Sequence, residues 1–230
     1  MPLLVFWNSN PDAVGQLTIE QIVANAGDGN LKDNSACSNE LRSFLREIQT
    51  SKIAEYVDQC LATPMPKGGL VLQDLVNELG HRLDYKVENG LYQGVTGGIG
   101  FDGVWRSGDG YAVVVEVKTT DAYRMSLDTL SKYRRKLMDA GKISENSSIL
   151  IVVGRQETGE LEAQIRGSRH AWDVRVISAE ALLKLVLLKE NAETPTVGAK
   201  IRGLLRPVEY TRLDSLADVM FDTVAEVDSP

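Results

Sequence analysis

Three residues in one short stretch carry side chains that suit phosphodiester chemistry. Asp102 is followed fourteen residues later by Glu116, and Lys118 comes two residues after that. Residues 107–110, with the sequence Ser-Gly-Asp-Gly, are a strong turn signal, so we expect a hairpin that brings the three side chains together. Two close carboxylates repel each other, and Mg²⁺, which prefers oxygen ligands, would relieve that repulsion. Because a metal-bound water is a good nucleophile, these residues predict hydrolysis of a phosphodiester.

Two strands must position these side chains. Residues 111–118 are rich in β-branched residues and are bounded by turn residues, which is typical of a strand. Side chains alternate between the faces of a strand, so Glu116 and Lys118 share one face and the neighbouring valines take the other. Residues 101–106 are predicted to form the preceding strand. Asp102 would then lie almost opposite Val115 and Glu116, at roughly 5 to 8 Å.

The segments around this hairpin indicate an α/β fold. Apolar spacing predicts a helix at residues 71–83 and another at 127–138. Runs of β-branched residues predict further strands at 85–88 and 149–153, so the order is helix, three strands, helix, strand. The chain is then predicted to continue with a short helix at 161–165, a strand at 174–177 and a helix capped by Ser178.

The acids, the lysine and this order of elements resemble the PD-(D/E)xK nuclease superfamily over about residues 68–190. Asp102 matches the first acid of the motif, Glu116 the second acid and Lys118 the lysine, whereas Phe101 stands where the motif has proline. The resemblance implies a restriction-endonuclease-like core, which is a mixed central sheet flanked by helices. It also implies a metal-dependent endonuclease that cuts DNA in restriction, antiphage defence or repair.

The resemblance assigns roles to individual residues. Asp102 and Glu116 would ligate Mg²⁺, for which Mn²⁺ can substitute, together with the backbone carbonyl of Val117. Lys118 would orient the attacking water or stabilise charge that develops on the phosphate.

Three accessory positions follow from the same resemblance. Many members carry an acid on the first core helix, and the alignment places Gln73 there, with Glu78 as an acidic neighbour. A neutral Gln73 favours chemistry with one metal ion, whereas Glu78 is either a further site residue or a solvated helix residue. Tyr133 matches a substrate-contacting tyrosine of the exonuclease branch, and the alternative is that it packs with Leu130 and Leu137.

The charge of the chain opposes nucleic-acid binding overall but not locally. The formal net charge is −7, whereas proteins that bind nucleic acid are usually basic. Basic residues cluster after the motif, however, and a local basic rim would suffice for binding that also needs a metal. The alternative is that these charges occupy solvated helix faces. The predicted DNA-binding residues are Arg124, Lys132, Arg134, Arg135, Arg166 and Arg169.

The chain of 230 residues divides into three parts. Residues 1–65 are predicted to be a helical N-terminal region, 66–190 the nuclease-like core, and 191–230 a C-terminal extension. The extension contains an apolar stripe at helical spacing in residues 213–224, which would dock on the core, join a homodimer or bind a partner protein. A partner could also bind the N-terminal region. A homodimer is expected on mechanism, since cutting both strands of a duplex often uses two symmetric sites.

The composition bears on the cellular compartment in which we expect the protein. No stretch is long and apolar enough to cross a membrane, and the first residues lack the features of a secretory signal. Only Cys37 and Cys60 occur, so we expect free thiols and a cytoplasmic protein.

Two alternatives to a DNA endonuclease remain. One is an interaction module, which is a nuclease fold with little or no activity that acts with a partner protein. The other is a structure-selective nuclease that acts on branched DNA or on RNA.

Overall fold

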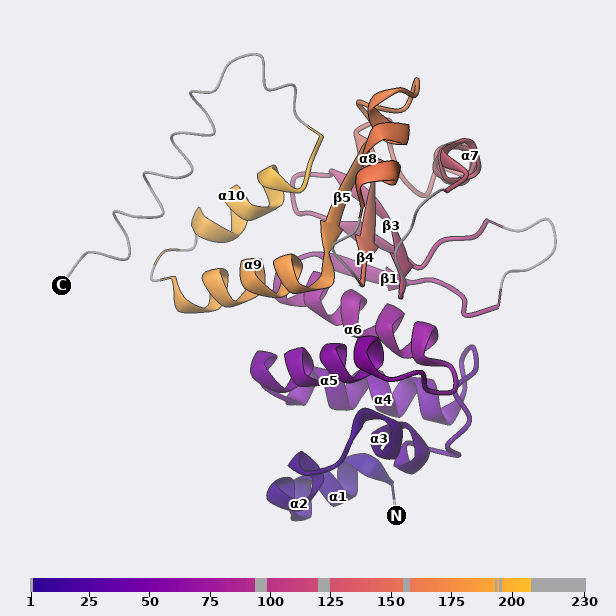
Figure 1. Ribbon diagram of the computed structural model, residues 1–230. Coiled ribbons are helices and arrows are strands. Elements are labelled where there is room, and N and C mark those ends of the chain that lie inside the picture. Colours follow the sequence, from indigo (N-terminus) through magenta and orange to yellow (C-terminus); the bar gives the residue numbers. More distant parts are fainter. Residues whose placement is uncertain are drawn as a thin grey trace.

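The protein folds around one five-stranded sheet (Figure 1). The computed structural model describes residues 2–93, 99–119, 125–154, 158–192, 194 and 196–207. The strands are β1 (Lys86–Asn89), β2 (Gly103–Arg106), β3 (Ala112–Lys118), β4 (Ser147–Val153) and β5 (Val174–Ser178). The helices are α1 (Leu3–Ser9), α2 (Pro11–Gly15), α3 (Ile19–Asn25), α4 (Ala36–Glu47), α5 (Thr50–Ala62), α6 (Gly68–Arg82), α7 (Leu127–Asp139), α8 (Gly159–Arg166), α9 (Ala179–Asn191) and α10 (Thr196–Leu204).

The sheet is mixed, and helices flank it, as predicted for the α/β class. β1, β2 and β3 pair antiparallel, whereas β3, β4 and β5 pair parallel. The predicted order of helix, three strands, helix, strand is confirmed by α6, β1, β2, β3, α7 and β4. In the hairpin, Gly103 pairs with Val115, so Asp102 lies level with Glu116 at the next position of the ladder.

Each face of the sheet packs against its own set of helices. Val113, Val115 and Val117 of β3 belong to the hydrophobic cluster that α6 and α9 share. Ala112 and Val114 point to the other face, where the apolar side chains of α7 and α8 cover β3 and β4. This alternation follows from the two-residue period of a strand and puts Glu116 and Lys118 on the side of α7.

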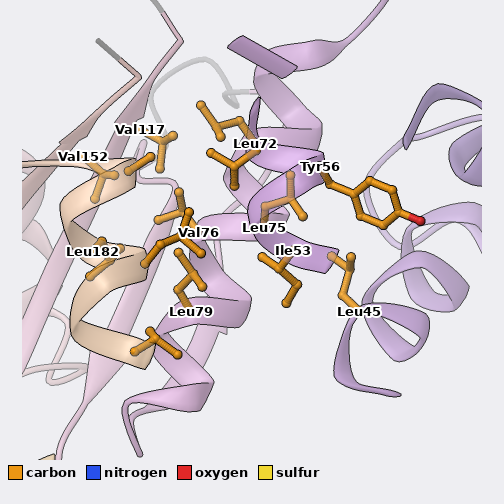
Figure 2. Close-up of a cluster of buried hydrophobic side chains, with 14 of the residues drawn as sticks. Leu45, Ile53, Tyr56, Leu72, Leu75, Val76, Leu79, Val117, Val152 and Leu182 are labelled. Carbon is orange, nitrogen blue, oxygen red and sulfur yellow. The ribbon is translucent and has the colours of Figure 1, made fainter. Parts of the chain in front are cut away.

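The N-terminal helices pack directly beneath α6 and share its hydrophobic cluster. Figure 2 shows Leu45, Ile53 and Tyr56 on one side of α6, and Val117 and Leu182 on the other. Helix α6 therefore lies between the N-terminal helices and the sheet, with apolar side chains on both sides.

The structure also shows the state of the two cysteines and the character of the described helices. Cys37 and Cys60 are both free, as predicted, and the structure shows that both are buried. In the described part of the chain, no helix has the length and apolar character needed to cross a membrane. The apolar stripe at 213–224 lies outside the described residues.

Candidate active site

Asp102 lies in the bend that leads into β2, and two hydrogen bonds fix it against β3. Its backbone N–H donates to the Val115 carbonyl at 3.0 Å, and its Oδ2 accepts from the Val117 N–H at 2.6 Å. The N–H and C=O groups of one strand residue point to the same side of the strand. The Val117 carbonyl is therefore directed to the side on which the Asp102 carboxylate lies.

Three donors converge on the backbone carbonyl of Asp102. They are the Gly90 N–H at 3.0 Å, Gln73 Nε2 at 3.0 Å and Asn77 Nδ2 at 2.8 Å. The Asn77 side chain is itself oriented, because its Oδ1 accepts from Trp105 Nε1 at 2.9 Å. Gln73 thus lies next to Asp102, where its amide donates to the backbone and holds Asp102 in place.

Asn77 and Gly103 complete this support, and the sequence interpretation included neither. Asn77 lies one helical turn after Gln73 on the same face of α6. Two polar residues four positions apart on a buried helix are the sequence feature that could have identified Asn77 as a supporting residue. A Cβ on Gly103 would overlap Asn77 Oδ1. Glycine at this position therefore lets the Asn77 amide reach the Asp102 carbonyl.

Glu116 and Lys118 lie beside each other on the exposed end of β3. Lys118 Nζ is 2.6 Å from Glu116 Oε1, and the Glu116 and Lys118 side chains are 16% and 41% exposed. Burial, followed by the negative charge of Glu116, raises the pKa of Asp102 from 3.8 to about 6. The Val117 N–H and Lys118 act in the opposite direction without cancelling that effect. The two carboxylates are therefore close enough to repel each other in a poorly solvated setting, which a cation would relieve.

Tyr133 lies on the face of α7 that packs towards the sheet. A Cβ built on Gly100 would be 3.1 Å from the Tyr133 ring, so the ring borders the segment that leads to Asp102. Leu130 and Leu137 belong to the hydrophobic cluster on the same side of the sheet, and Tyr133 packs against it. The ring thus combines a packing role with a position near the acids.

The structure does not bring Glu78 to the other acids. Its carboxylate pairs with Arg82 Nε at 3.1 Å, and burial raises its pKa while Arg82 opposes the rise. Arg82 also donates to the Leu45 and Ile48 carbonyls, at 3.0 and 2.6 Å. Glu78 therefore stabilises the junction of α6 with the N-terminal helices, on a different face of α6 from Gln73.

The predicted DNA-binding residues divide into paired and unpaired cations. Arg134 pairs with Asp173, Arg166 with Glu162 and Arg169 with Asp128, at 2.9, 3.3 and 2.8 Å. Lys132 and Arg135 are exposed, and neither forms an ion pair with another described residue. Arg124 lies outside the described residues.

Most of these cations border a groove along α7. The groove has a volume of about 370 Å³, and its lining includes Lys132, Arg134, Arg135 and Arg169. Successive residues of a helix are about 100° apart, so Lys132 and Arg134 project to either side of Tyr133 and Arg135 projects nearly opposite to it. Asp102, Glu116 and Lys118 are not among the residues that line this groove.

The N-terminal region holds the chain just after β1. Asp33 accepts from the Tyr92 N–H at 2.7 Å and from the Gln93 N–H at 3.3 Å. The Tyr92 hydroxyl donates to Asp74, which also pairs with Arg42 at 2.9 Å. These contacts join residues far apart in the sequence, and no local pattern predicts them.

The donors near Asp102 suit a hard cation. Among the residues that the structure describes, no group of three or more His, Cys, Asp or Glu side chains could hold a metal. Two carboxylates and one backbone carbonyl would leave several positions to water, which is the manner in which proteins bind Mg²⁺. In comparisons with protein-family models and with curated proteins, nothing matches this chain.

Proposed function

We propose that the protein is a metal-dependent nuclease that hydrolyses phosphodiester bonds in DNA, as an endonuclease of restriction, antiphage defence or repair. The observation that carries the proposal is the pair of carboxylates, Asp102 and Glu116, on one sheet face with Lys118 Nζ 2.6 Å from Glu116. The order of elements around them supports a restriction-endonuclease-like core with PD-(D/E)xK chemistry.

Each residue of the pair would have a defined role. Asp102, Glu116 and the Val117 carbonyl would hold Mg²⁺ or Mn²⁺, and the ion supplies a Lewis acid and an activated water. The Lys118 ammonium group would orient that water or stabilise negative charge on the phosphate. Gln73 would act as a positioning residue, because its amide bonds to the Asp102 carbonyl and leaves the metal site with two carboxylates.

Substrate binding would rely on local positive charge. Lys132 and Arg135 are exposed cations of the α7 groove that form no ion pair with another described residue, and they would meet phosphate groups. A homodimer would supply the second site that a double-strand cut needs, through the N-terminal helices or through residues 213–224.

A cleavage assay with four variants tests the proposal. Purified protein is incubated with plasmid, linear duplex, single-stranded DNA, branched DNA and RNA, in Mg²⁺, Mn²⁺ or EDTA. Metal-dependent cutting should fall about 100-fold or more in Asp102→Asn, Glu116→Gln and Lys118→Met. Glu160→Gln, which removes an exposed acid on α8, is the matched control and should cut normally. Cutting that survives in the first three variants would refute the assignment.

A second candidate is an interaction module with little activity. Two features favour it: the Lys118 ammonium group already pairs with Glu116 at 2.6 Å, and Gln73 stands where many members of the resembled superfamily carry an acid. The module would bind a partner protein through the N-terminal helices or the C-terminal extension. Calorimetric titration with Mg²⁺ separates the two functions, since a nuclease site binds the ion and Asp102→Asn abolishes that binding.

A further inference from the structure

Trp172 is the most exposed large apolar side chain among the described residues, with 65% of its surface accessible. It lies in the loop between α8 and β5, whereas Trp105 is fully buried and Trp7 packs edge-on against Phe44. Tryptophan is largely buried on average in folded proteins. An exposed indole such as that of Trp172 is therefore unusual, and the residues around it indicate a reason for its exposure.

The loop that presents Trp172 is fixed on both sides. Before it, His170 is only 8% exposed, and its Nε2 lies 2.8 Å from Asp128 Oδ1 of α7. After it, Asp173 accepts from Arg134 at 2.9 Å, and the Asp173 N–H donates to the His170 carbonyl at 2.9 Å. The backbone around Trp172 is thus attached to α7, while the indole itself projects outward.

The same two anchors line the cationic groove. His170 and Asp173 border the hollow of about 370 Å³ together with Lys132, Arg134, Arg135 and Arg169. Arg134 and Arg169 have acidic partners, whereas Lys132 and Arg135 form no ion pair within the part of the chain that the structure describes. The loop that carries this exposed ring therefore forms part of the wall of a groove whose lining has more cations than acids.

We infer that this face of α7 binds single-stranded nucleic acid, with an unpaired base stacked on Trp172 and backbone phosphates on Lys132 and Arg135. Single-strand binding sites combine a basic groove with aromatic rings on which bases stack. A fully paired duplex offers phosphates but hides the faces of its bases in the stack. The inference deepens the proposed function, on which it rests for the class of ligand, by selecting substrates with unpaired segments, such as flaps and branches.

The test measures binding in EDTA, so that cleavage plays no part. Full-length protein with Asp102→Asn is titrated with a fluorescein-labelled oligothymidylate and with a blunt, fully paired duplex of two strands. Protein with the native groove should prefer the oligothymidylate, which should quench the fluorescence of Trp172. Trp172→Ala should weaken binding of the single strand by roughly 5- to 100-fold and leave binding of the duplex unchanged. Trp172→Phe, which keeps a ring, should restore most of the affinity.

Salt dependence tests the two cations separately. Lys132→Gln with Arg135→Gln should reduce the slope of log K against log salt by about 1.4 for two phosphate contacts on a single strand. Lys86→Gln, an exposed lysine on edge strand β1, is the control and should leave the slope unchanged.

Equal binding by wild-type and Trp172→Ala protein, or no preference for the single strand, would overturn the inference. A protein that cuts duplex DNA through Asp102 but shows neither effect would keep the proposed function and lose this one. Binding of the single strand through Trp172 without any metal-dependent cutting would keep the binding site and refute the proposed nuclease function.

Discussion

Replacing Asp102 with asparagine should stabilise the folded protein at neutral pH. Burial and the charge of Glu116 raise the pKa of Asp102 from 3.8 to about 6. Since each tenfold change in acidity is worth about 1.4 kcal/mol, the ionised carboxylate costs the folded state about 3 kcal/mol above pH 6. Asparagine has no charge, and its Oδ1 can still accept from the Val117 N–H.

The stability difference between Asp102→Asn and the wild type depends on pH, because the pKa of Asp102 differs between the folded and the unfolded state. Below about pH 3 the carboxyl is protonated in both the folded and the unfolded state, so the penalty is absent. Between about pH 4 and pH 6 the unfolded state is largely ionised while the folded state keeps its proton, and the stability of the wild type falls as the pH rises. Asp102→Asn should therefore match the wild type near about pH 3 and exceed it by up to about 3 kcal/mol at pH 7.

Urea unfolding in EDTA at a series of pH values measures this difference. Asp139→Asn, at the exposed end of α7, is the matched control for the removal of one acid at the surface. Adding Mg²⁺ at about ten times its dissociation constant should then stabilise the wild type by about 1.4 kcal/mol and leave Asp102→Asn unchanged. An Asp102→Asn protein that is no more stable than the wild type at pH 7 would refute the argument that this carboxylate is electrostatically strained.

Three further predictions concern the residues that support the site. Gly103→Ala should destabilise the fold by about 1–3 kcal/mol in urea unfolding and reduce cleavage, because its Cβ would displace the Asn77 amide. Arg82→Met should cost about 3–5 kcal/mol, since it leaves the Glu78 carboxylate buried without its partner, and Glu78→Gln in the same chain should recover part of that loss in thermal unfolding. Asp33→Ala should speed hydrogen exchange of the two amides that it accepts from, at residues 92 and 93, whereas Asp12→Asn should not. Unchanged exchange would show that this contact does not hold the chain after β1.

Local patterns in the sequence predicted the central part of the fold. The period of two in β3 separates Glu116 and Lys118 from Val115 and Val117, and the turn at 107–110 sets the pairing of Gly103 with Val115. Those two facts bring Asp102 level with Glu116, so the meeting of the acids follows from short-range information. The strand order also follows from short-range information, because strands that are neighbours in the chain are neighbours in the sheet.

The sequence could not predict which polar residues of α6 face the sheet, because this depends on how the helix is rotated about its axis. Gln73 and Glu78 are both polar residues on one helix, and the sequence does not show which of them faces the sheet. Packing decides this, since α6 is buried on two sides and its polar residues point either to β2 or to the N-terminal helices. Contacts such as Asp33 with the Tyr92 N–H join residues 59 positions apart and have no local signal.

The support around Asp102 explains how a strained carboxylate can persist. Repulsion from Glu116 would favour a bend that turns Asp102 away, but the three donors on its carbonyl and the Val117 N–H on its Oδ2 oppose that movement. Two of these donors come from α6, which apolar side chains and the Arg82 hydrogen bonds attach to the N-terminal helices. A disturbance of those helices that shifts α6 would therefore reach the Asp102 backbone through Gln73 and Asn77. The N-terminal helices and the acids are thus connected through α6, and Gln73→Ala would remove one of the two side-chain hydrogen bonds in that connection without removing either carboxylate.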